Sequence, residues 1–560
     1  MAKYAAEIVI GLLVIAASLQ INIRAFIKNA VFSILHSVVA KKQEEFTVLS
    51  KILLIILFGA FCFILTYKIT EVPDPYHVDE AGMAYDAFSI ANYGVDRYLY
   101  KYPVYLLNFG DGQSVLYAYL AAACIKLFGY SVISVRIPAI VLSVISALLF
   151  SFTVRREYGN AASIIMTGLF CVLPFSVMHS RWGLDCYLLF PMMIVSCTLL
   201  YKAVVSGKTW LFIVSGLSFG ITLYTYVLSY IIIPLLLALC IIMLIYTKQI
   251  NFKQLLALGI PLFFLALPLI LLVCVNNGLI NEIRTPYFSI PKLRVYRGNE
   301  ISIRNIIKNL KLNKNNFFYR IFVYDNIRFN ALIKYGSLYY FSLPILFWGG
   351  FLSCKNAVNS LKKRKFSFDF LMAGLFFSGF IISLLLNDIN MNRACEVFIP
   401  LFYFLCIGIL GLFQKRKAAA YAAGFLFLVN FSFFYHDYLV EYPKELMKPG
   451  LNVNIHDLKN ALDFAKSIDN DKKYIYITQQ PNIWTAIILE TNPYSYNETK
   501  PTLVGKDSVP YYFTGRLEPD FISPEKIIIS RDPDEIPDDL GAYGLKSMQF
   551  NSISVLYTVD

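Results

Sequence analysis

Long apolar runs dominate the chain as far as residue 435 and are interrupted mainly by short polar turns. Many approach the roughly 20 residues that a helix needs to cross a bilayer. They carry few charges and lack the alternation typical of membrane strands. The pattern predicts an all-α polytopic membrane protein with about 12 transmembrane helices, at residues 5–23, 51–69, 131–153, 161–178, 186–204, 210–227, 229–247, 254–275, 336–353, 368–386, 396–413 and 418–435.

The pattern changes beyond these spans. "IHDLKNALDFAKSI" has apolar residues at helical spacing, and "YIYIT", "KIIIS" and "SVLYT" are typical of short strands between turn-forming stretches. These features predict a small C-terminal α/β domain. We therefore expect an N-terminal membrane anchor with an interfacial helix at 1–45, a transmembrane core at 46–438 with outer loops 70–130 and 276–335, and the α/β domain at 439–560.

Basic clusters give the orientation of the spans. They fall only in alternate loops, which the positive-inside rule places in the cytoplasm. Examples are Arg155 with Arg156, "KKRK" at 362–365 and "QKRK" at 414–417. The loops 70–130 and 276–335, the turns "HSRWGLD" and "NDINMNRA", and the C-terminal domain are then predicted to be extracytoplasmic.

Composition supports the same class. The 560 residues are 57% hydrophobic and 16% charged, with a net charge of +13. The tail from His436 carries 12 Lys and Arg against 19 Asp and Glu, so the excess positive charge lies in the loops between spans. That distribution fits membrane orientation and argues against a nucleic-acid partner. The 10 cysteines form no metal-binding or disulfide pattern, and no Gly-rich phosphate loop is present, so we expect no metal and no cofactor.

The candidate chemistry begins at "YHVDEAGMAYD", residues 76–86. Two adjacent acids, Asp79 and Glu80, stand where the second span reaches the outer face, with His77 just upstream. A helix is predicted from Asp79 to just before Gly94. Asp79 is then either its N-cap or a general base, and the two roles are compatible because a cap fixes the carboxylate in place.

A second polar position lies at the start of the next span. Residues 114–128 predict a surface helix, and "VRIPAIV" then places Arg136 at the outer end of a membrane helix. An arginine at that depth is costly. It either extends to the interface or pairs with a carboxylate such as Asp79.

These features together resemble a known superfamily. The acidic pair Asp79–Glu80, a surface helix ending in "LFGYS", "VRIPA" opening the next span and "REYG" closing it are similar to glycosyltransferases of the GT-C fold. The resemblance is to the branch related to protein O-mannosyltransferases and the bacterial aminoarabinose transferase of lipid A. It covers residues 51 to about 435, and the span 5–23 lies outside it.

The resemblance implies an enzyme of the bacterial cell membrane. Its donor would be a sugar on a polyprenyl phosphate, its acceptor a glycan, glycolipid or protein, and Asp79 the base at the outer face. Glu80 would orient the acceptor or pair with a basic residue. Candidate ligands of the donor phosphate are Arg393, Arg136, Arg294 and Arg297, and candidate substrate contacts are His179, Arg181, Asp185 and Tyr226.

Other interpretations stay open at this point. Most of these side chains have an ordinary alternative, such as a solvated charge, a satisfied turn or an interfacial aromatic. A transporter would place ionisable residues at mid-membrane, where this chain has few. A metal-dependent oligosaccharyltransferase would need several carboxylates, and Asp86, Asp96 and Asp111 lack ligand spacing. A non-catalytic envelope protein is the third alternative.

Overall fold

The computed structural model describes residues 45–73, 76–295, 305–325, 327, 329–446, 452–468, 474–478, 483–496, 502–505, 509–515, 517–530, 532–551 and 553–558. It has two compact units. The first contains residues 1–67, 139–273 and 295–437, and the second contains residues 68–138, 274–294 and 438–560. The predicted N-terminal anchor and interfacial helix, and the span 5–23, lie outside the described residues.

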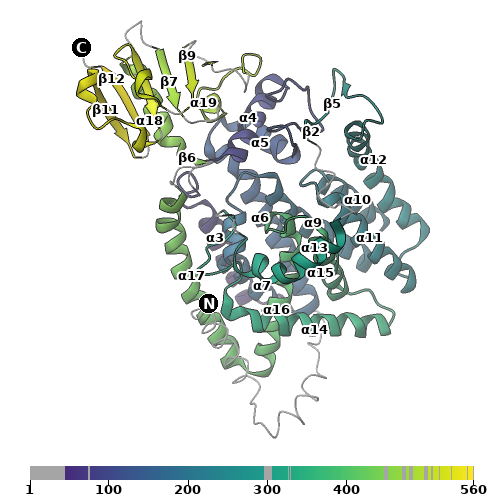
Figure 1. The fold of residues 1–560 in the computed structure, drawn as a ribbon. Coiled ribbons are helices and arrows are strands. Elements are labelled where there is room, and N and C mark those ends of the chain that lie inside the picture. The colour runs from purple at the N-terminus through teal and green to yellow at the C-terminus, as the bar shows by residue number, and fades with distance from the viewer. Residues whose placement is uncertain are drawn as a thin grey trace. The chain divides into compact units, whose positions relative to one another are not determined.

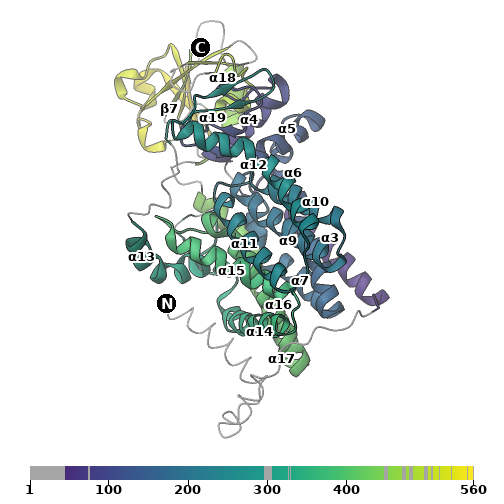
Figure 2. The same ribbon diagram turned by 90° about the vertical axis from the view of Figure 1, so that its right-hand side faces the viewer.

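Helices form most of the first unit (Figures 1 and 2). They are α3 (Val48–Thr66), α6 (Val132–Tyr158), α7 (Asn160–Val172), α8 (Pro174–His179), α9 (Leu189–Ser206), α10 (Thr209–Thr222), α11 (Ser229–Tyr246), α12 (Phe252–Asn276), α13 (Ile306–Phe318), α14 (Leu343–Lys362), α15 (Phe368–Leu385), α16 (Phe398–Lys415) and α17 (Lys417–Leu446). The short helices η1 (Asp185–Leu188), η4 (Tyr319–Val323), η5 (Tyr340–Ser342) and η6 (Asn392–Val397) connect them.

Eight helices within the described residues are long and apolar enough to cross a membrane. The prediction of a polytopic helical membrane protein is confirmed, whereas the count of about twelve spans is not. The predicted span 161–178 is divided at Leu173 into α7 and α8, and α10, in place of the predicted span 210–227, has only 14 residues. Each is shorter than a bilayer crossing requires.

Close backbone contact holds α14 against α16. A Cβ atom on Gly349 would overlap the carbonyl oxygen of Phe404, and one on Gly408 would overlap that of Ile345. Without a hydrophobic driving force between helices in lipid, such small residues allow van der Waals packing at short range. The helix η6–α16 is almost wholly buried as a result of contacts on all sides.

The second unit contains the first predicted outer loop and the tail. The loop has β1 (Tyr76–His77), α4 (Val78–Tyr93), β2 (Tyr105–Leu106), β3 (Gln113–Ser114) and α5 (Leu116–Phe128), and residues 274–294 add the hairpin β4 (Ile283–Arg284) and β5 (Ser289–Ile290). The tail contributes β6 (Asn452–Val453), α18 (Ile455–Ser467), β7 (Tyr474–Thr478), α19 (Ile483–Ile488), β8 (Thr502–Val504), β9 (Pro510–Thr514), η7 (Pro519–Phe521), β10 (Lys526–Ser530), η8 (Pro533–Glu535), η9 (Leu540–Tyr543), β11 (Leu545–Phe550) and β12 (Ile553–Thr558).

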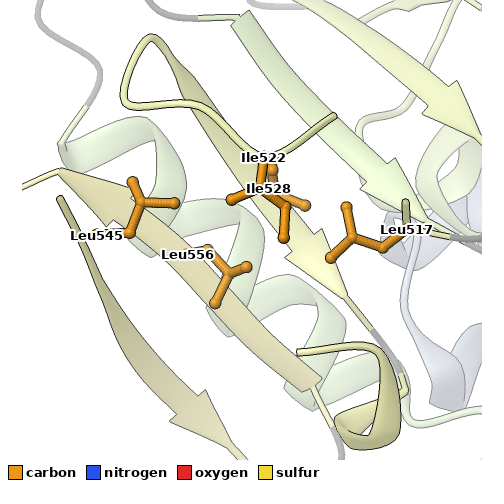
Figure 3. Close-up of a cluster of buried hydrophobic side chains, with 5 residues drawn as sticks. All are labelled: Leu517, Ile522, Ile528, Leu545 and Leu556. Atoms are coloured by element: carbon orange, nitrogen blue, oxygen red, sulfur yellow. The ribbon is translucent and has the colours of Figure 1, made fainter. Parts of the chain in front are cut away.

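The tail folds as the predicted α/β domain. Its six-stranded sheet has the order β11-β12-β10-β7-β9-β8, and β7 is parallel to both β9 and β10. Successive side chains of a strand point to opposite faces of the sheet. Since Ile527, Ile528 and Ile529 of β10 are all buried, both faces of the sheet are covered at this strand, which explains its uninterrupted apolar run. Ile528 and its cross-strand partner Leu556 lie in a cluster with Leu517, Ile522 and Leu545 (Figure 3). Phe464 of α18 instead contacts the next residue along β12, Tyr557, at 5.3 Å between ring centroids.

Candidate active site

The first turn of α4 carries the acidic pair. The helix begins at Val78, and its N-cap is His77, whose Nδ1 accepts a hydrogen bond from the backbone N–H of Asp79 at 3.3 Å. The prediction that Asp79 itself is the N-cap is therefore wrong. The predicted end is confirmed, since Gly94 closes the helix in the left-handed conformation that glycine tolerates best.

Glu80 and Arg136 form a buried ion pair. The Arg136 Nε donates to Glu80 Oε1 and its Nη2 donates to Oε2, each at 2.8 Å, and the two side chains are 1% and 0% exposed. The remaining Nη1 donates to the carbonyl of Ile69 at 2.8 Å. Of the two alternatives for Arg136, pairing with a carboxylate is therefore the one that the structure has, but the partner is Glu80 instead of Asp79.

Asp79 has a different environment from its neighbour. Its side chain is 41% exposed, and its Oδ2 lies 3.5 Å from His77 Nδ1. Burial lowers the pKa of His77 in spite of the nearby carboxylates Asp79 and Glu80, which raise it. A neutral imidazole whose Nδ1 already accepts a hydrogen bond from a backbone N–H cannot donate through that atom to the Asp79 carboxylate. The Asp79 carboxylate is therefore partly exposed to solvent, in contrast to Glu80.

The tail contacts the segment that leads into α4. Strand β6 pairs antiparallel with β1, with Tyr76 opposite Val453. The indole N–H of Trp484 donates to the carbonyl of Tyr76 at 3.1 Å, and the Tyr85 hydroxyl donates to the carbonyl of Thr491 at 2.9 Å. Both bonds are buried, so the C-terminal domain holds α4 on either side of the acidic pair.

A buried polar cluster, which the sequence did not reveal, fixes the loop after α4. Asp86 Oδ1 accepts the backbone N–H of Arg97 at 3.0 Å, and the Arg97 guanidinium donates to Asn108 Oδ1 and lies 3.7 Å from Asp86 Oδ2. The guanidinium packs onto Gly82, where a Cβ would come within 2.6 Å of it. The only sequence signal is the glycine in the interior of a helix.

The hairpin β4–β5 lies over the same loop. The Tyr100 hydroxyl donates to Glu282 Oε2 at 3.0 Å, and the Arg284 guanidinium stands 4.2 Å from the Tyr100 ring centroid. Ser289 exchanges backbone hydrogen bonds with Tyr102 and Val104. Arg294 ends this segment with an exposed side chain, 5.8 Å from the Tyr98 ring centroid. Arg294 thus belongs to the same unit as Asp79, whereas Arg297 lies outside the described residues.

The other candidates belong to the helical unit. Arg181 is fully buried and donates to the carbonyls of Ile64, Leu65 and Tyr67, the last turn of α3, at 2.6, 3.0 and 2.8 Å. His179 is buried with its ring stacked on Phe175 at 3.9 Å, and burial lowers its pKa to about 3. These contacts favour structural roles for both. Asp185 is also buried, with Oδ1 accepting the Cys186 N–H, while Tyr226 is half-buried between α10 and α11.

Arg393 lies at the start of η6. It is half-buried, and its Nη1 donates to the carbonyl of Asp388 at 3.0 Å. One turn further on, the carboxyl group of Glu396 is fully buried, and no other described residue donates a hydrogen bond to it. Glu396 is not among the site residues that the sequence pattern predicts, although an acid in an otherwise apolar span is a signal of function.

Comparisons with known proteins bear on this arrangement. Residues 113–275 match the family of dolichyl-phosphate-mannose-protein mannosyltransferases. The predicted resemblance to polyprenyl-phosphate glycosyltransferases is confirmed over this segment. Among curated protein sequences, none matches this chain.

Solved structures give weaker similarity over more of the chain. One is ArnT from Cupriavidus metallidurans bound to undecaprenyl phosphate, at 12% identity and a TM-score of 0.48, over 90% of this chain and 97% of that one. Another is the Archaeoglobus fulgidus oligosaccharyltransferase in its apo form, at 12% identity and a TM-score of 0.46, over 80% and 64%. A third is the oligosaccharyltransferase AglB from the same organism with an inhibitory peptide and a dolichol-phosphate, at 13% identity and a TM-score of 0.43, over 80% and 64%.

The buried carboxyl group of Asp96 predicts a pH-dependent stability of the loop. Its Oδ1 accepts backbone N–H groups of Tyr98 and Tyr100, while burial and then Asp86 raise the pKa of Asp96 to about 8. The folded form therefore holds this proton more tightly than the unfolded chain, where the value is about 4. This stabilisation is complete below about pH 4 and is lost progressively as the pH rises to about 8.

We therefore expect Asp96→Asn to lessen the fall in melting temperature between about pH 5 and about pH 8, because the amide keeps the acceptor and cannot ionise. The melting temperature at each pH is measured by thermal unfolding of the purified protein in detergent. The matched control is Asp463→Asn, at an exposed position of α18. Equal pH dependence in Asp96→Asn and wild type would contradict the assignment.

Proposed function

We propose that this protein transfers a sugar from a polyprenyl-phosphate donor to an acceptor hydroxyl at the outer face of the membrane, with Asp79 as the general base. The observation that carries the proposal is the contrast within one helical turn. Asp79 is exposed, whereas Glu80 beside it is buried and paired with Arg136. The match of residues 113–275 to a mannosyltransferase family supports the reaction class.

The contacts give the two acids separate roles. Glu80 accepts two charge-assisted hydrogen bonds from Arg136, and both side chains are removed from solvent. Neither is placed to touch a substrate, so we assign both as positioning residues that hold the first turn of α4. This assignment replaces direct roles for Glu80 in acceptor binding and for Arg136 in phosphate binding. A general base must be held within a few tenths of an ångström of its working position, and such rigid support provides this.

The proposed step is a single displacement. Asp79 takes the proton of the acceptor hydroxyl as the acceptor oxygen bonds to the anomeric carbon. The bond from that carbon to the phosphate oxygen breaks, and its electron pair leaves with the polyprenyl phosphate. The products are the glycosylated acceptor and polyprenyl phosphate, with inversion at the anomeric carbon. Phosphate is a good leaving group, so no general acid is required.

The proposed reaction also requires a positively charged side chain beside the donor phosphate. A guanidinium group can meet two phosphate oxygens at once and offset the charge that develops on them. Arg393 and Arg294 are the described candidates, because their side chains are half-buried and exposed instead of fully enclosed. Arg297 remains a candidate from the sequence. We propose Tyr226 and Asp185 as weaker candidates for substrate contact.

The outer-face location is supported by the composition of the second unit. Three segments that the charge pattern predicts to be extracytoplasmic belong to it, namely the first outer loop, residues 276–294 and the tail. They are joined by the β1–β6 pairing and by the contacts of the β4–β5 hairpin with the first loop. Segments that pack together as one compact unit must lie on the same side of a membrane.

Activity and stability should separate at the acidic pair. We expect Asp79→Asn to lose nearly all transfer with little change in melting temperature. Glu80→Gln leaves the buried Arg136 without a countercharge, which typically costs about 3–5 kcal/mol, so it should lower the melting temperature strongly. Glu71→Gln, at an exposed acid of the same loop, is the matched control and should change neither quantity.

The measurements are sugar transfer from a short-chain polyprenyl-phosphate sugar and thermal unfolding in detergent. Near-normal turnover by Asp79→Asn would disprove the base assignment. Full stability of Glu80→Gln would show that the ion pair does not hold the turn.

The orientation can be tested without an assay of activity. In a cysteine-free background, Lys292→Cys and Glu518→Cys should react with a membrane-impermeant thiol reagent added to intact cells, because both positions are exposed in the second unit. Lys363→Cys, in the basic cluster between α14 and α15, should react only after the membrane is permeabilised. Labelling of Lys363→Cys in sealed cells would overturn the predicted topology.

Arg393 can be tested by its effect on the donor. Loss of a charge-assisted hydrogen bond to the phosphate should weaken binding of the donor by about 1.5–3 kcal/mol, roughly ten- to a hundredfold in affinity. We expect this in the KM for donor of Arg393→Ala at fixed acceptor, with partial recovery in Arg393→Lys. If neither variant changes the donor KM, the phosphate ligand is another arginine.

A further inference from the structure

Helix α13 packs onto the bundle through its polar side. Its buried residues, Asn309, Asn313 and Phe317, are spaced four apart and so lie along one face. Asn309 Nδ2 donates to the carbonyl of Leu385 at 3.0 Å, and Asn313 Nδ2 donates to those of Leu384 and Leu386 at 3.2 and 2.6 Å. The two amides thus satisfy carbonyl groups that the last turn of α15 leaves free.

This contact fixes the depth of α13. Helix α15 is one of the apolar helices long enough to cross a membrane, and it begins just after the basic cluster "KKRK". Figures 1 and 2 both show α13 beside α15, and the hydrogen bonds join it to the end of α15 opposite that cluster. Phe317 meets Phe380, one turn deeper in α15, at 4.7 Å between ring centroids. Helix α13 therefore lies where α15 leaves the apolar layer.

The outward side of α13 combines apolar and basic side chains. Ile307 is 71% exposed, Leu312 is 49% exposed and Phe318 is 53% exposed. Lys308, Lys311 and Lys314 are exposed among them, and the helix contains no acid. A helix facing water would not present large apolar residues in this way. One lying at the membrane surface would bury them between acyl chains while the lysine stems reach the phosphates.

We propose that the outward face of α13 is a binding surface for the phosphate headgroups of anionic bilayer lipids. The charge pattern argues for this ligand specifically. The end of α15 that α13 contacts lies opposite the basic cluster that the charge pattern predicts to be cytoplasmic, so the positive-inside rule does not account for the lysines of α13. Three lysines without an acid, placed at headgroup depth, attract the negative charge of anionic lipid headgroups. The surface is independent of the proposed transfer reaction.

The test uses the full-length protein in vesicles. A single cysteine at position 307 (Ile307→Cys, in a cysteine-free background) carries an environment-sensitive fluorophore. The vesicles are made of phosphatidylcholine and contain one lipid that bears a nitroxide on its acyl chain. This labelled lipid is either phosphatidylglycerol or phosphatidylcholine, at equal mole fraction. We expect quenching by both lipids, about twofold or more stronger with phosphatidylglycerol and reduced by salt.

Variants separate the lysines from net charge. Lys308→Gln/Lys311→Gln/Lys314→Gln should make the two lipids equally effective, whereas Lys101→Gln/Lys459→Gln/Lys546→Gln, the same loss of charge at exposed positions of the other unit, should keep the preference. Absence of quenching by either lipid would show that this face does not meet the bilayer. Equal quenching in the unmodified protein would exclude recognition of the headgroup. If a short-chain polyprenyl phosphate abolishes the preference for phosphatidylglycerol, the lysines bind the donor phosphate and not the bilayer lipids.

Discussion

The buried pair Glu80–Arg136 is the interaction on which the candidate site depends. Two charges without solvent are stable only when they are paired and hydrogen-bonded, and here each of the three guanidinium nitrogen atoms of Arg136 donates to an oxygen atom of Glu80 or Ile69. The pair ties the first turn of α4 to the start of α6 and to the chain after α3. Its geometry is bidentate, so it restricts rotation as well as distance.

Much of the second unit reinforces that turn. Trp484 and strand β6 hold the residues before α4, and the contact between Tyr85 and Thr491 holds its middle. The cluster of Asp86, Arg97 and Asn108 then attaches the following loop to the same helix. The C-terminal domain is therefore a structural support for α4 as well as a separate fold. A catalytic carboxylate on a loop would otherwise move with the loop.

The helical unit shows how polar groups are accommodated beside lipid. Arg181 and the asparagines of α13 donate to carbonyl groups at the ends of α3 and α15, where a helix leaves four acceptors without partners. These side chains look functional in a sequence because they are polar near a membrane. In the structure they complete the hydrogen bonding of helix ends, which is the stricter requirement where water is scarce.

The sequence by itself determined the membrane class, the start and end of most helices and the α/β character of the tail, because these follow from local periodicity, caps and composition. It also located the acidic pair, and the motifs around it carried the family resemblance. It could not divide the roles of Asp79 and Glu80, since adjacent residues on a helix point in different directions and only the position of Arg136, 56 residues away in the chain, decides which is buried. It likewise could not show that His179 and Arg181 are enclosed, or that α13 turns its asparagines inward. Those outcomes depend on contacts between segments distant in sequence, and only the tertiary structure establishes them.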